Sequence, residues 1–455
     1  MLVDKLGVCS PAARRITPKR TDGAICTIRP SDFLDTVRET IAEAVQLSGC
    51  RKRDIQGVSY ASQTNTFVLL DKNRKPISDI YVWSTVFSDE TDPVMSALFS
   101  SDDFLHITGN GYSSSALMVA KLKWLAINKP QLFDKCRYVA NLPDFLILGL
   151  TGNLLCDASS ASLLGLLDIG KLTWWDQTMD LLCMDSSMFP HVLSPGVGCG
   201  HTAGDNPFGL EAGIPVIAGG LDHLIAAYGA GIGYLAPYSE STGTVLALTG
   251  LKDTIKVDRN VTVGPALDSR YSHIAFHGYA AEAFEEFREL FCPDLTFDQM
   301  FLSSEDVPVG CDGLRFNDDP AFDDVFIRRF SRPVKHRGEG VRAIMEALAF
   351  RLKKLSALVA GDEVIHSVVA TGGGNLSRQL LAVKADLLRC EIVLCPRTEF
   401  GAFGAAMVTA GAIGWFSTIR EAQCAWIVES GRIEPDTERS RAYRSWAEKN
   451  ERPYL

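Results

Sequence analysis

The chain alternates between segments with helical hydrophobic spacing and short apolar runs typical of strands. Residues 338–359 place apolar side chains on one face and predict the strongest helix. Residues 33–48, which follow Pro30-Ser31-Asp32, predict another helix, capped by Ser31 or Asp32 and stopped at Gly49. Apolar runs at 214–218 and 364–370 predict strands, each followed by glycines and a helical segment. This alternation predicts an α/β fold.

Other segments carry weaker patterns. Leu2 and Val3 begin a strand-like run, and residues 131–149 predict a helix interrupted at Leu142-Pro143-Asp144. Residues 194–207 are rich in Gly and Pro and predict a loop. The charged tail from Glu429 is expected at the periphery. We expect a domain boundary near Gly213, which gives domains of residues 1–213 and 214–455.

Composition narrows the class of protein. The 455 residues suit two large domains, and 46% hydrophobic with 22% charged residues is ordinary for a globular protein. A net charge of −10 argues against nucleic acid and acidic membranes as partners. The sequence has neither a secretory signal nor an apolar run long enough for a membrane span. Twelve scattered cysteines without a C-x-x-C pair predict reduced thiols and a cytoplasmic protein. A homodimer is left open.

Asp222 is the first candidate for chemistry. It follows Gly219-Gly220 at the end of a predicted strand, and open α/β sheets bind ligands outside the carboxyl ends of their strands. The alternative is that Asp222 is an N-cap of the following helix. His223 is suited either to touching a substrate or to satisfying a backbone carbonyl.

Two small-residue turns are candidates for phosphate or nucleotide binding. Ser241-Thr242-Gly243-Thr244 lies between two strand-like runs, and successive backbone amides in such turns form anion-binding concavities. A plain hairpin is the alternative. The glycines at 372–374 follow a predicted strand and precede a helix beginning at Ser377, so they allow close backbone approach at a helix N-terminus.

These motifs together resemble the FGGY family of carbohydrate kinases. The resemblance covers roughly residues 2–416 and includes GGLDH (219–223), STGT (241–244), ATGGGNLS (370–377) and LPDFLILGLTGNLLCDASSAS (142–162). It implies two ribonuclease-H-like, actin-like ATPase domains that face each other across a cleft. It further implies an ATP-dependent kinase that phosphorylates a sugar, polyol or sugar acid and uses ATP with Mg²⁺. Metal binding by protein side chains alone is not expected.

The resemblance also implies roles for individual residues. Asp222 matches the general base that takes the proton from the sugar hydroxyl. On the substrate side Gln63 and Trp83 match family positions, and Asn65 and His223 are further candidates for contact with the sugar. For Gln63 and Asn65 a structural role in the loop is the alternative. The ATP side matches Ser241, Thr242, Gly243, Thr244, Gly372, Gly373, Gly374 and Ser377, with Gly373 and Ser377 against the adenosine. Thr64-Asn65 replaces the family's common Met-His, and the Asp and Arg that usually follow Trp83 are absent.

Two features of the family are not matched: a first strand ending in Asp-x-Gly-Thr-Thr, and a Ser-Gly-Glu-Arg loop near residues 316–318. Both concern nucleotide phosphates. We therefore expect low thermal stability and weak turnover, with the segment Met1–Cys9 a candidate to replace the unmatched strand. A kinase is the favoured hypothesis, and a non-catalytic FGGY-like sugar- or nucleotide-binding regulatory protein is the alternative. The sugar and the hydroxyl that is phosphorylated are left open.

Overall fold

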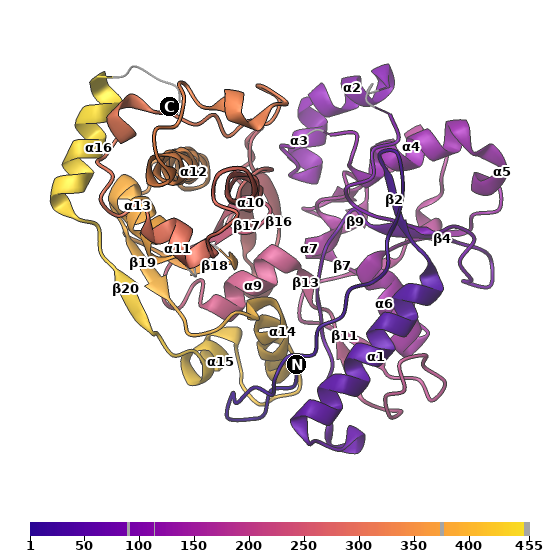
Figure 1. Ribbon diagram of the computed structural model, residues 1–455. Coiled ribbons are helices and arrows are strands. Elements are labelled where there is room, and N and C mark those ends of the chain that lie inside the picture. Colours follow the sequence, from indigo (N-terminus) through magenta and orange to yellow (C-terminus); the bar gives the residue numbers. More distant parts are fainter. Residues whose placement is uncertain (89–91, 113, 374–376, 450–455) are drawn as a thin grey trace. The chain divides into compact units, whose positions relative to one another are not determined.

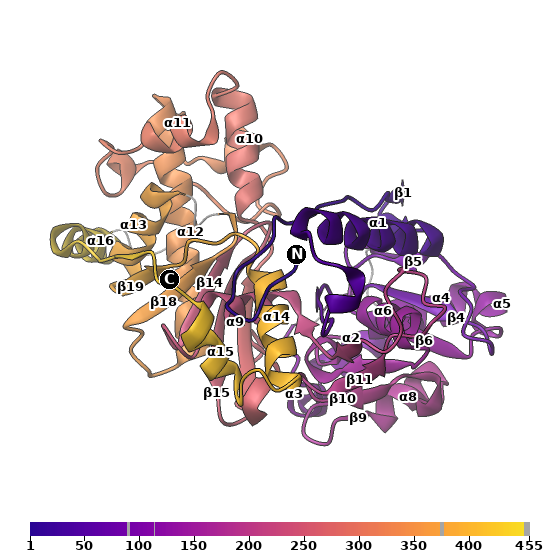
Figure 2. The same ribbon diagram turned by 90° about the horizontal axis from the view of Figure 1, so that it is seen from below.

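The computed structural model describes residues 1–88, 92–112, 114–373 and 377–449 (Figures 1 and 2). The chain divides into two compact units, and each unit is made of segments that are separate in the sequence. The first unit comprises Met1–Gly229, Lys252–His273 and Glu399–Ile427. The second comprises Ala230–Leu251, Ile274–Thr398 and Val428–Leu455, of which residues 374–376 and 450–455 are outside the described part. Both units combine sheets with helices, as the α/β pattern predicts.

The first unit contains a five-stranded antiparallel sheet covered by two helices. Its order is β1 (Arg20–Asp22), β2 (Ile25–Ile28), β5 (Ile80–Tyr81), β4 (Phe67–Leu70) and β6 (Tyr138–Asn141). Apolar side chains of this sheet pack against α1 (Pro30–Ser48) and α6 (Leu142–Thr151). Phe33 of α1 and Phe145 of α6 meet with ring centroids 6.0 Å apart, so the two helices share one core.

Short strands from distant parts of the chain complete the first unit. β3 (Ala61–Ser62) pairs in parallel with β13 (Gly220–Leu221), and β12 (Pro215–Ile217) pairs antiparallel with β11 (Gly198–His201). Their apolar residues form a second core with α6. This pairing ties the segment around Gly220 to the strand near residue 61, so the first unit extends to Gly229 and not to the expected boundary at Gly213.

The second unit is built on a seven-stranded sheet. Its order is β16 (Thr262–Pro265), β17 (Tyr271–His277), β15 (Leu246–Lys252), β14 (Tyr238–Thr242), β18 (Ser367–Thr371), β19 (Glu391–Leu394) and β20 (Gly431–Ile433). β14, β18 and β19 run in parallel, as strands of a nucleotide-binding α/β sheet do. The long helix α12 (Arg337–Ala360) lies beside α13 (Arg378–Leu388) in Figure 1. Both helices confirm the sequence predictions for these segments.

The remaining elements connect these parts. The other helices are α2 (Pro93–Ser100), α3 (Asp102–Thr108), α4 (Met118–Asn128), α5 (Pro130–Phe133), α7 (Ala158–Ala161), α8 (Asp176–Leu182), α9 (Asp222–Ala230), α10 (Ala281–Phe291), α11 (Phe297–Leu302), α14 (Phe400–Ala412), α15 (Ile419–Trp426) and α16 (Thr437–Lys449). Two further strand pairs are β7 (Leu155–Asp157) with β10 (His191–Leu193), and β8 (Leu167–Asp168) with β9 (Thr173–Trp174). No helix in the described part of the chain combines the length and apolarity needed to cross a bilayer. None of the twelve cysteines forms a disulfide.

Three predicted segments take a different form. Residues 131–149 contain strand β6 between two helices, because Asn141 and Asp144 form a capping box that starts α6. The expected loop 194–207 contains β11, which pairs with β12. Helix α1 ends at Gly49 as predicted but begins earlier, because its N-cap is Arg29 with Pro30 as the first helical residue, and neither Ser31 nor Asp32 caps it.

The two ends of the chain also differ from expectation. Val3 and Cys9 form a single antiparallel bridge, and this small N-terminal hairpin lies beside α15 in Figures 1 and 2, outside the five-stranded sheet. Trp426 of α15 donates its indole hydrogen bond to the carbonyl of Lys5 over 3.2 Å. The tail from Glu429, expected at the periphery, forms edge strand β20 and helix α16, and Arg439 of this helix pairs with the buried carboxylate of Asp386.

Candidate active site

Gln63 and Asp222 follow two neighbouring strands of the first unit. Gly220 pairs with Ala61 and Leu221 pairs with Ser62 in the parallel β13–β3 ladder. The next residues along the two strands are Asp222 and Gln63. Because parallel strands bring their carboxyl ends to the same edge, these residues lie at one site, where α/β sheets bind ligands. The structure thus brings together two of the predicted substrate-side residues.

A buried polar network holds the β13–β3 pair in place. The backbone N–H of Leu221 donates to Oγ of Ser159 (3.1 Å), and this hydroxyl donates to Oδ1 of Asp157 (2.7 Å). The hydroxyl of Tyr60 donates to Oδ2 of Asp157 (3.0 Å), which is fully buried. A side chain at Gly219 would place its Cβ 1.8 Å from the carbonyl oxygen of Tyr60, so this glycine is needed for the strands to approach.

Asp222 opens helix α9 with a half-buried side chain. Its Oδ1 accepts a hydrogen bond from the backbone N–H of His223 over 2.8 Å. Within the described residues Oδ2 accepts no hydrogen bond, and the carboxylate takes part in no ion pair. Asp222 is therefore held through one carboxylate oxygen at the carboxyl end of a strand. His223 is half-buried beside it.

Asn65 and Trp83 occupy separate segments of the first unit. Asn65 has a left-handed backbone (φ 56°), and both polar atoms of its side chain are engaged: Oδ1 accepts from Met118 N–H (2.8 Å) and Nδ2 donates to Leu163 O (3.1 Å). The side chain of Trp83 is 44% exposed, while its backbone N–H donates to Oγ1 of Thr66 (2.9 Å). Asn65 thus shapes its loop, and Trp83 offers an accessible ring.

The predicted nucleotide turns of the second unit also follow neighbouring parallel strands. Ser241 of β14 pairs with Thr371 of β18, so Thr242 and Gly372 are the next residues on the two strands. Gly372 has φ 79°, and an added Cβ would lie 2.5 Å from the carbonyl oxygen of Thr242. The two turns therefore touch, and only glycine fits at this contact. The structure brings together motifs that are 130 residues apart in sequence.

The outer side of these turns is open. An added Cβ at Gly243 or at Gly373 would meet no atom within 4 Å among the described residues, and Thr244 is exposed. Ser377 is buried and caps α13 through its hydroxyl, which accepts from Leu380 N–H (3.2 Å). Gly374 lies outside the described residues. Space beside two glycines near a helix start suits a nucleotide, which is the fit that the motifs predict.

The sequence analysis missed an ion pair beneath the first turn. Nζ of Lys384, on α13, lies 2.9 Å from Oε2 of Glu240, and both side chains are fully buried. Thr242 is 1% exposed; its Oγ1 donates to Oε2 of Glu240 (3.0 Å) and accepts from Lys384. The side chain of Thr242 is therefore engaged beneath the turn and is not available to a ligand. The sequence signal for this pair was one charged residue, Glu240 or Lys384, within each of two apolar segments.

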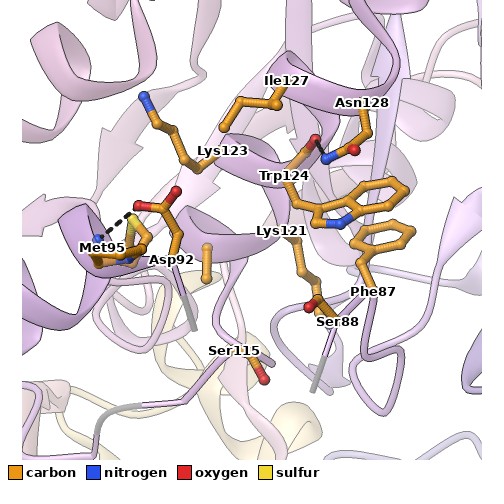
Figure 3. A pocket seen from close by; sticks show the side chains of 12 residues that line it. Phe87, Ser88, Asp92, Met95, Ser115, Lys121, Lys123, Trp124, Ile127 and Asn128 are labelled. Carbon is orange, nitrogen blue, oxygen red and sulfur yellow. Dashed lines mark hydrogen bonds between the residues drawn. The ribbon is translucent and has the colours of Figure 1, made fainter. Parts of the chain in front are cut away.

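The first unit contains a pocket of about 260 Å³ (Figure 3). Phe87 and Trp124 stack on one wall with ring centroids 4.4 Å apart. Lys121, Lys123 and Asp92 supply charged groups to its lining. The pocket lies beside the segment that carries Trp83, because Lys121 donates a hydrogen bond to the carbonyl of Trp83 (2.8 Å).

The described residues contain no group of three or more His, Cys, Asp or Glu side chains that could hold a metal ion. Mg²⁺ is often bound through one or two carboxylates together with substrate phosphates and water, so a dedicated cage is not required for Mg-ATP.

Comparison with known proteins identifies the family. Residues 7–229 match the N-terminal domain and residues 314–413 the C-terminal domain of the FGGY family of carbohydrate kinases. Xylulose kinase of Bacillus subtilis is 25% identical over 473 aligned positions, which cover 98% of this chain and 92% of that protein. Glycerol kinase of Thermococcus onnurineus is 24% identical over 92% of this chain and 88% of its own length.

Solved structures agree on the fold. The ligand-bound xylulose kinase from Lactobacillus acidophilus superimposes with a TM-score of 0.83 at 18% identity, covering 97% of this chain and 93% of that one. The xylulose kinase from Rhodospirillum rubrum gives 0.82 at 22% identity, covering 96% and 91%. These matches confirm the predicted class, the two-domain actin-like ATPase fold.

The chain belongs to the FGGY family of carbohydrate kinases. It is accordingly an ATP-dependent sugar or polyol kinase, a phosphotransferase, as the sequence predicts. The relatives named here are kinases, and no observation supports the alternative of a non-catalytic binding protein.

Proposed function

We propose that the protein transfers the γ-phosphoryl group of ATP to a hydroxyl of a small ketose or polyol, with Asp222 as the general base. The observation that carries this proposal is the placement of Asp222 and Gln63 at the carboxyl ends of the adjacent parallel strands β13 and β3. Xylulose is the first acceptor to test, because several relatives are named xylulose kinases; glycerol is the second.

The chemistry assigned to Asp222 is proton removal and orientation. Its carboxylate accepts the proton of the attacking hydroxyl as that oxygen bonds to the γ-phosphorus and the bond to ADP breaks. The bond from His223 N–H to Oδ1 fixes the carboxylate, and Oδ2 accepts no hydrogen bond from a described residue. Gln63 is assigned to hydrogen bonding with sugar hydroxyls, and Trp83 to contact with the sugar's apolar face.

The nucleotide is assigned to the second unit. The space beside Gly243 and Gly373 supports this assignment, since an added Cβ at either residue would meet no described atom and a ligand can approach the backbone closely there. Mg²⁺ bound to the ATP phosphates would neutralise charge that develops on them during transfer. Phosphoryl transfer depends mainly on positioning, so holding the two substrates accurately is the main task of the protein residues.

The proposed function is tested by measuring ADP release from Mg-ATP with a panel of acceptors: xylulose, glycerol, gluconate and a no-sugar control. We expect sugar-dependent turnover with at least one acceptor, at a rate below the usual kinase range of about 1–100 s⁻¹, because the family's first phosphate loop is not matched. Equal ADP release in all wells, with and without sugar, would contradict the proposal. Phosphorylated product identified by mass spectrometry then names the acceptor.

A further inference from the structure

Lys121, on α4, is buried and bonded only to backbone carbonyls. Its side chain lines the pocket in Figure 3, yet the residue is 1% exposed. Nζ donates to the carbonyl oxygens of Asn65 (3.1 Å), Val82 (3.1 Å) and Trp83 (2.8 Å). Three donors thus meet three acceptors, which matches the hydrogen-bonding capacity of an ammonium group.

The ammonium has no counter-ion among the described residues. Burial without an ion pair lowers the pKa of Lys121 to about 7, because burial disfavours the charged form. The charged and titratable groups on the elements around Lys121 make other contacts. Asp92 caps α2, Lys123 donates to Leu181 O, and Asp79 lies 3.7 Å from Arg20. Tyr81 packs against Phe67 and Phe87, and Asp176 and Asp180 of α8 are exposed.

The three carbonyls belong to the two segments that carry predicted substrate residues. Asn65 lies two residues after Gln63, in the connection between β3 and β4. Trp83 follows β5, and its N–H is tied to Thr66. Lys121 therefore joins the Gln63 segment to the Trp83 segment in addition to the Trp83–Thr66 bond, and it does so from a third element, α4.

We propose that Lys121 is a positioning residue for the acceptor: its ammonium holds the Gln63–Asn65 and Val82–Trp83 segments in the sugar-binding arrangement, so the affinity for sugar depends on its charge. This inference rests on the proposed kinase function. Lys121 does not touch the reacting atoms. A neutral amine has two N–H donors and a lone pair, so deprotonation removes one of the three bonds and turns the lone pair toward a carbonyl.

The sign of the pH effect follows from this change. Below the pKa of Lys121 all three carbonyls are bound and the acceptor site is formed. As pH rises through about 7, one bond is lost and the KM for sugar rises. The KM for ATP should not follow, because the nucleotide is assigned to the second unit.

The test measures kcat and both KM values from pH 6 to 9, with xylulose and glycerol as acceptors. In the wild type we expect the sugar KM to rise about tenfold across this range. Lys121→Met should show a high, pH-independent sugar KM while its KM for ATP stays within about twofold of the wild-type value. Lys121→Arg, which keeps its charge at every pH, should flatten the profile. Lys123→Met, the neighbouring lysine of the same pocket, should behave as the wild type.

Two results would overturn the inference: a wild-type sugar KM that does not change with pH, which needs no variant, or a pH-dependent rise that persists in Lys121→Met. Circular dichroism establishes that each variant is folded. If no acceptor is phosphorylated, the proposed function fails first, and calorimetric binding of xylulose at pH 6 and pH 9 then decides about Lys121. Absence of binding at both pH values would overturn both proposals.

Discussion

The ion pair between Glu240 and Lys384 shows how a single buried pair shapes the nucleotide turn. The two side chains are fully buried and meet Thr242 directly before the turn at Gly243. Desolvating two charges is costly, and the attraction between them offsets this cost only when the geometry and additional hydrogen bonds are good. Here Thr242 donates to Oε2 of Glu240 and accepts from Lys384, while Oε1 of Glu240 is buried without a hydrogen-bond partner among the described residues. The pair therefore fixes the side chain that precedes the turn.

Replacing one partner of this pair should lower the free energy of unfolding far more than replacing both partners. Lys384→Met leaves the buried carboxylate of Glu240 without its cation, and we expect a loss of about 3–5 kcal/mol in the free energy of unfolding. Lys384→Met combined with Glu240→Leu should recover most of that loss. Urea denaturation measures both values, with Lys354→Met on the exposed side of α12 as the control. Additive losses in the double variant would contradict the account.

Sequence pattern predicted the position of Asp222 after a strand, but not the contacts that support that strand. Asp222 was placed correctly after a strand because glycines and a helical segment flank it. The support of Leu221 by Ser159 and Asp157, and the pairing of Glu240 with Lys384, join residues that are 62 and 144 positions apart. Contacts at such separations depend on tertiary packing, which local hydrophobic spacing does not encode.

At the scale of elements, the two glycines after β18 have different roles. A Cβ at Gly372 would lie 2.5 Å from Thr242 O, and the positive φ adds strain, so Gly372→Ala should cost more than about 1 kcal/mol of stability. A Cβ at Gly373 meets no described atom. This difference separates a glycine required by the fold from one that we assign to the ligand.

Gly373→Val should therefore leave the protein folded and weaken ADP binding. We expect about a tenfold loss of affinity, or about 1.4 kcal/mol, because the new side chain occupies space that we assign to the nucleotide. Isothermal calorimetry with ADP measures the loss, and a thermal melt establishes that the variant is folded. Unchanged ADP affinity in a folded Gly373→Val protein would show that the nucleotide does not bind at this turn.

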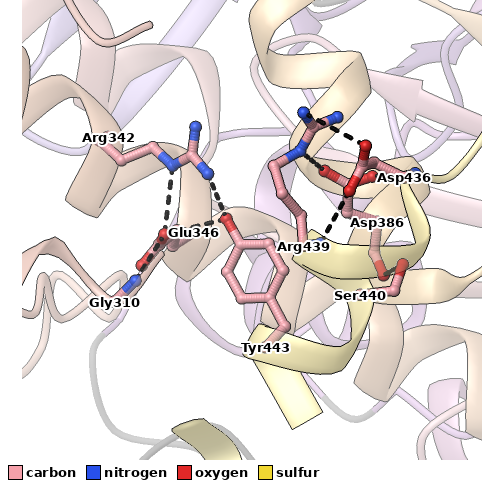
Figure 4. A network of polar contacts seen from close by, with 8 residues as sticks. All are labelled: Gly310, Arg342, Glu346, Asp386, Asp436, Arg439, Ser440 and Tyr443. Carbon is pink, nitrogen blue, oxygen red and sulfur yellow. Dashed lines mark hydrogen bonds and ion pairs between the residues drawn. The ribbon is translucent and has the colours of Figure 1, made fainter. Parts of the chain in front are cut away.

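Helix α16 is held to the second unit by polar contacts that the charged tail did not reveal (Figure 4). The hydroxyl of Tyr443 donates to Glu346 (2.9 Å) and accepts from Arg342 (2.7 Å), and the residue is 2% exposed. Arg439 pairs with Asp386 nearby. The charge of the tail predicted a peripheral position but not these contacts, in which polar side chains point into the second unit.

Tyr443→Phe tests this docking. The change removes only the hydroxyl and leaves a buried guanidinium nitrogen of Arg342 without its acceptor, so we expect a loss of about 1–3 kcal/mol in unfolding free energy. Tyr112→Phe, at a residue that is 60% exposed, should change stability by less than about 0.5 kcal/mol. Equal stability of the two variants would show that the Tyr443 hydroxyl contributes nothing.

At the scale of the whole molecule, the α/β class and the family were predicted from sequence, while the division of the chain was not. The first unit includes residues 252–273 and 399–427, which a single boundary near Gly213 places in the second domain. The chain leaves and re-enters each unit, and no local composition change marks those crossings. In both units, however, the candidate residues follow adjacent parallel strands, β3 and β13 in one and β14 and β18 in the other.

This arrangement assigns the acceptor and its base to one unit and the nucleotide to the other. The measurement that tests it most directly is turnover and binding of Asp222→Asn beside Asp205→Asn, an exposed aspartate of the same unit. We predict that Asp222→Asn loses on the order of 10²–10⁴ in kcat while its affinities for sugar and ADP stay close to those of the wild type. Asp205→Asn should be fully active. An Asp222→Asn protein that retains most of its sugar-dependent turnover would contradict the account.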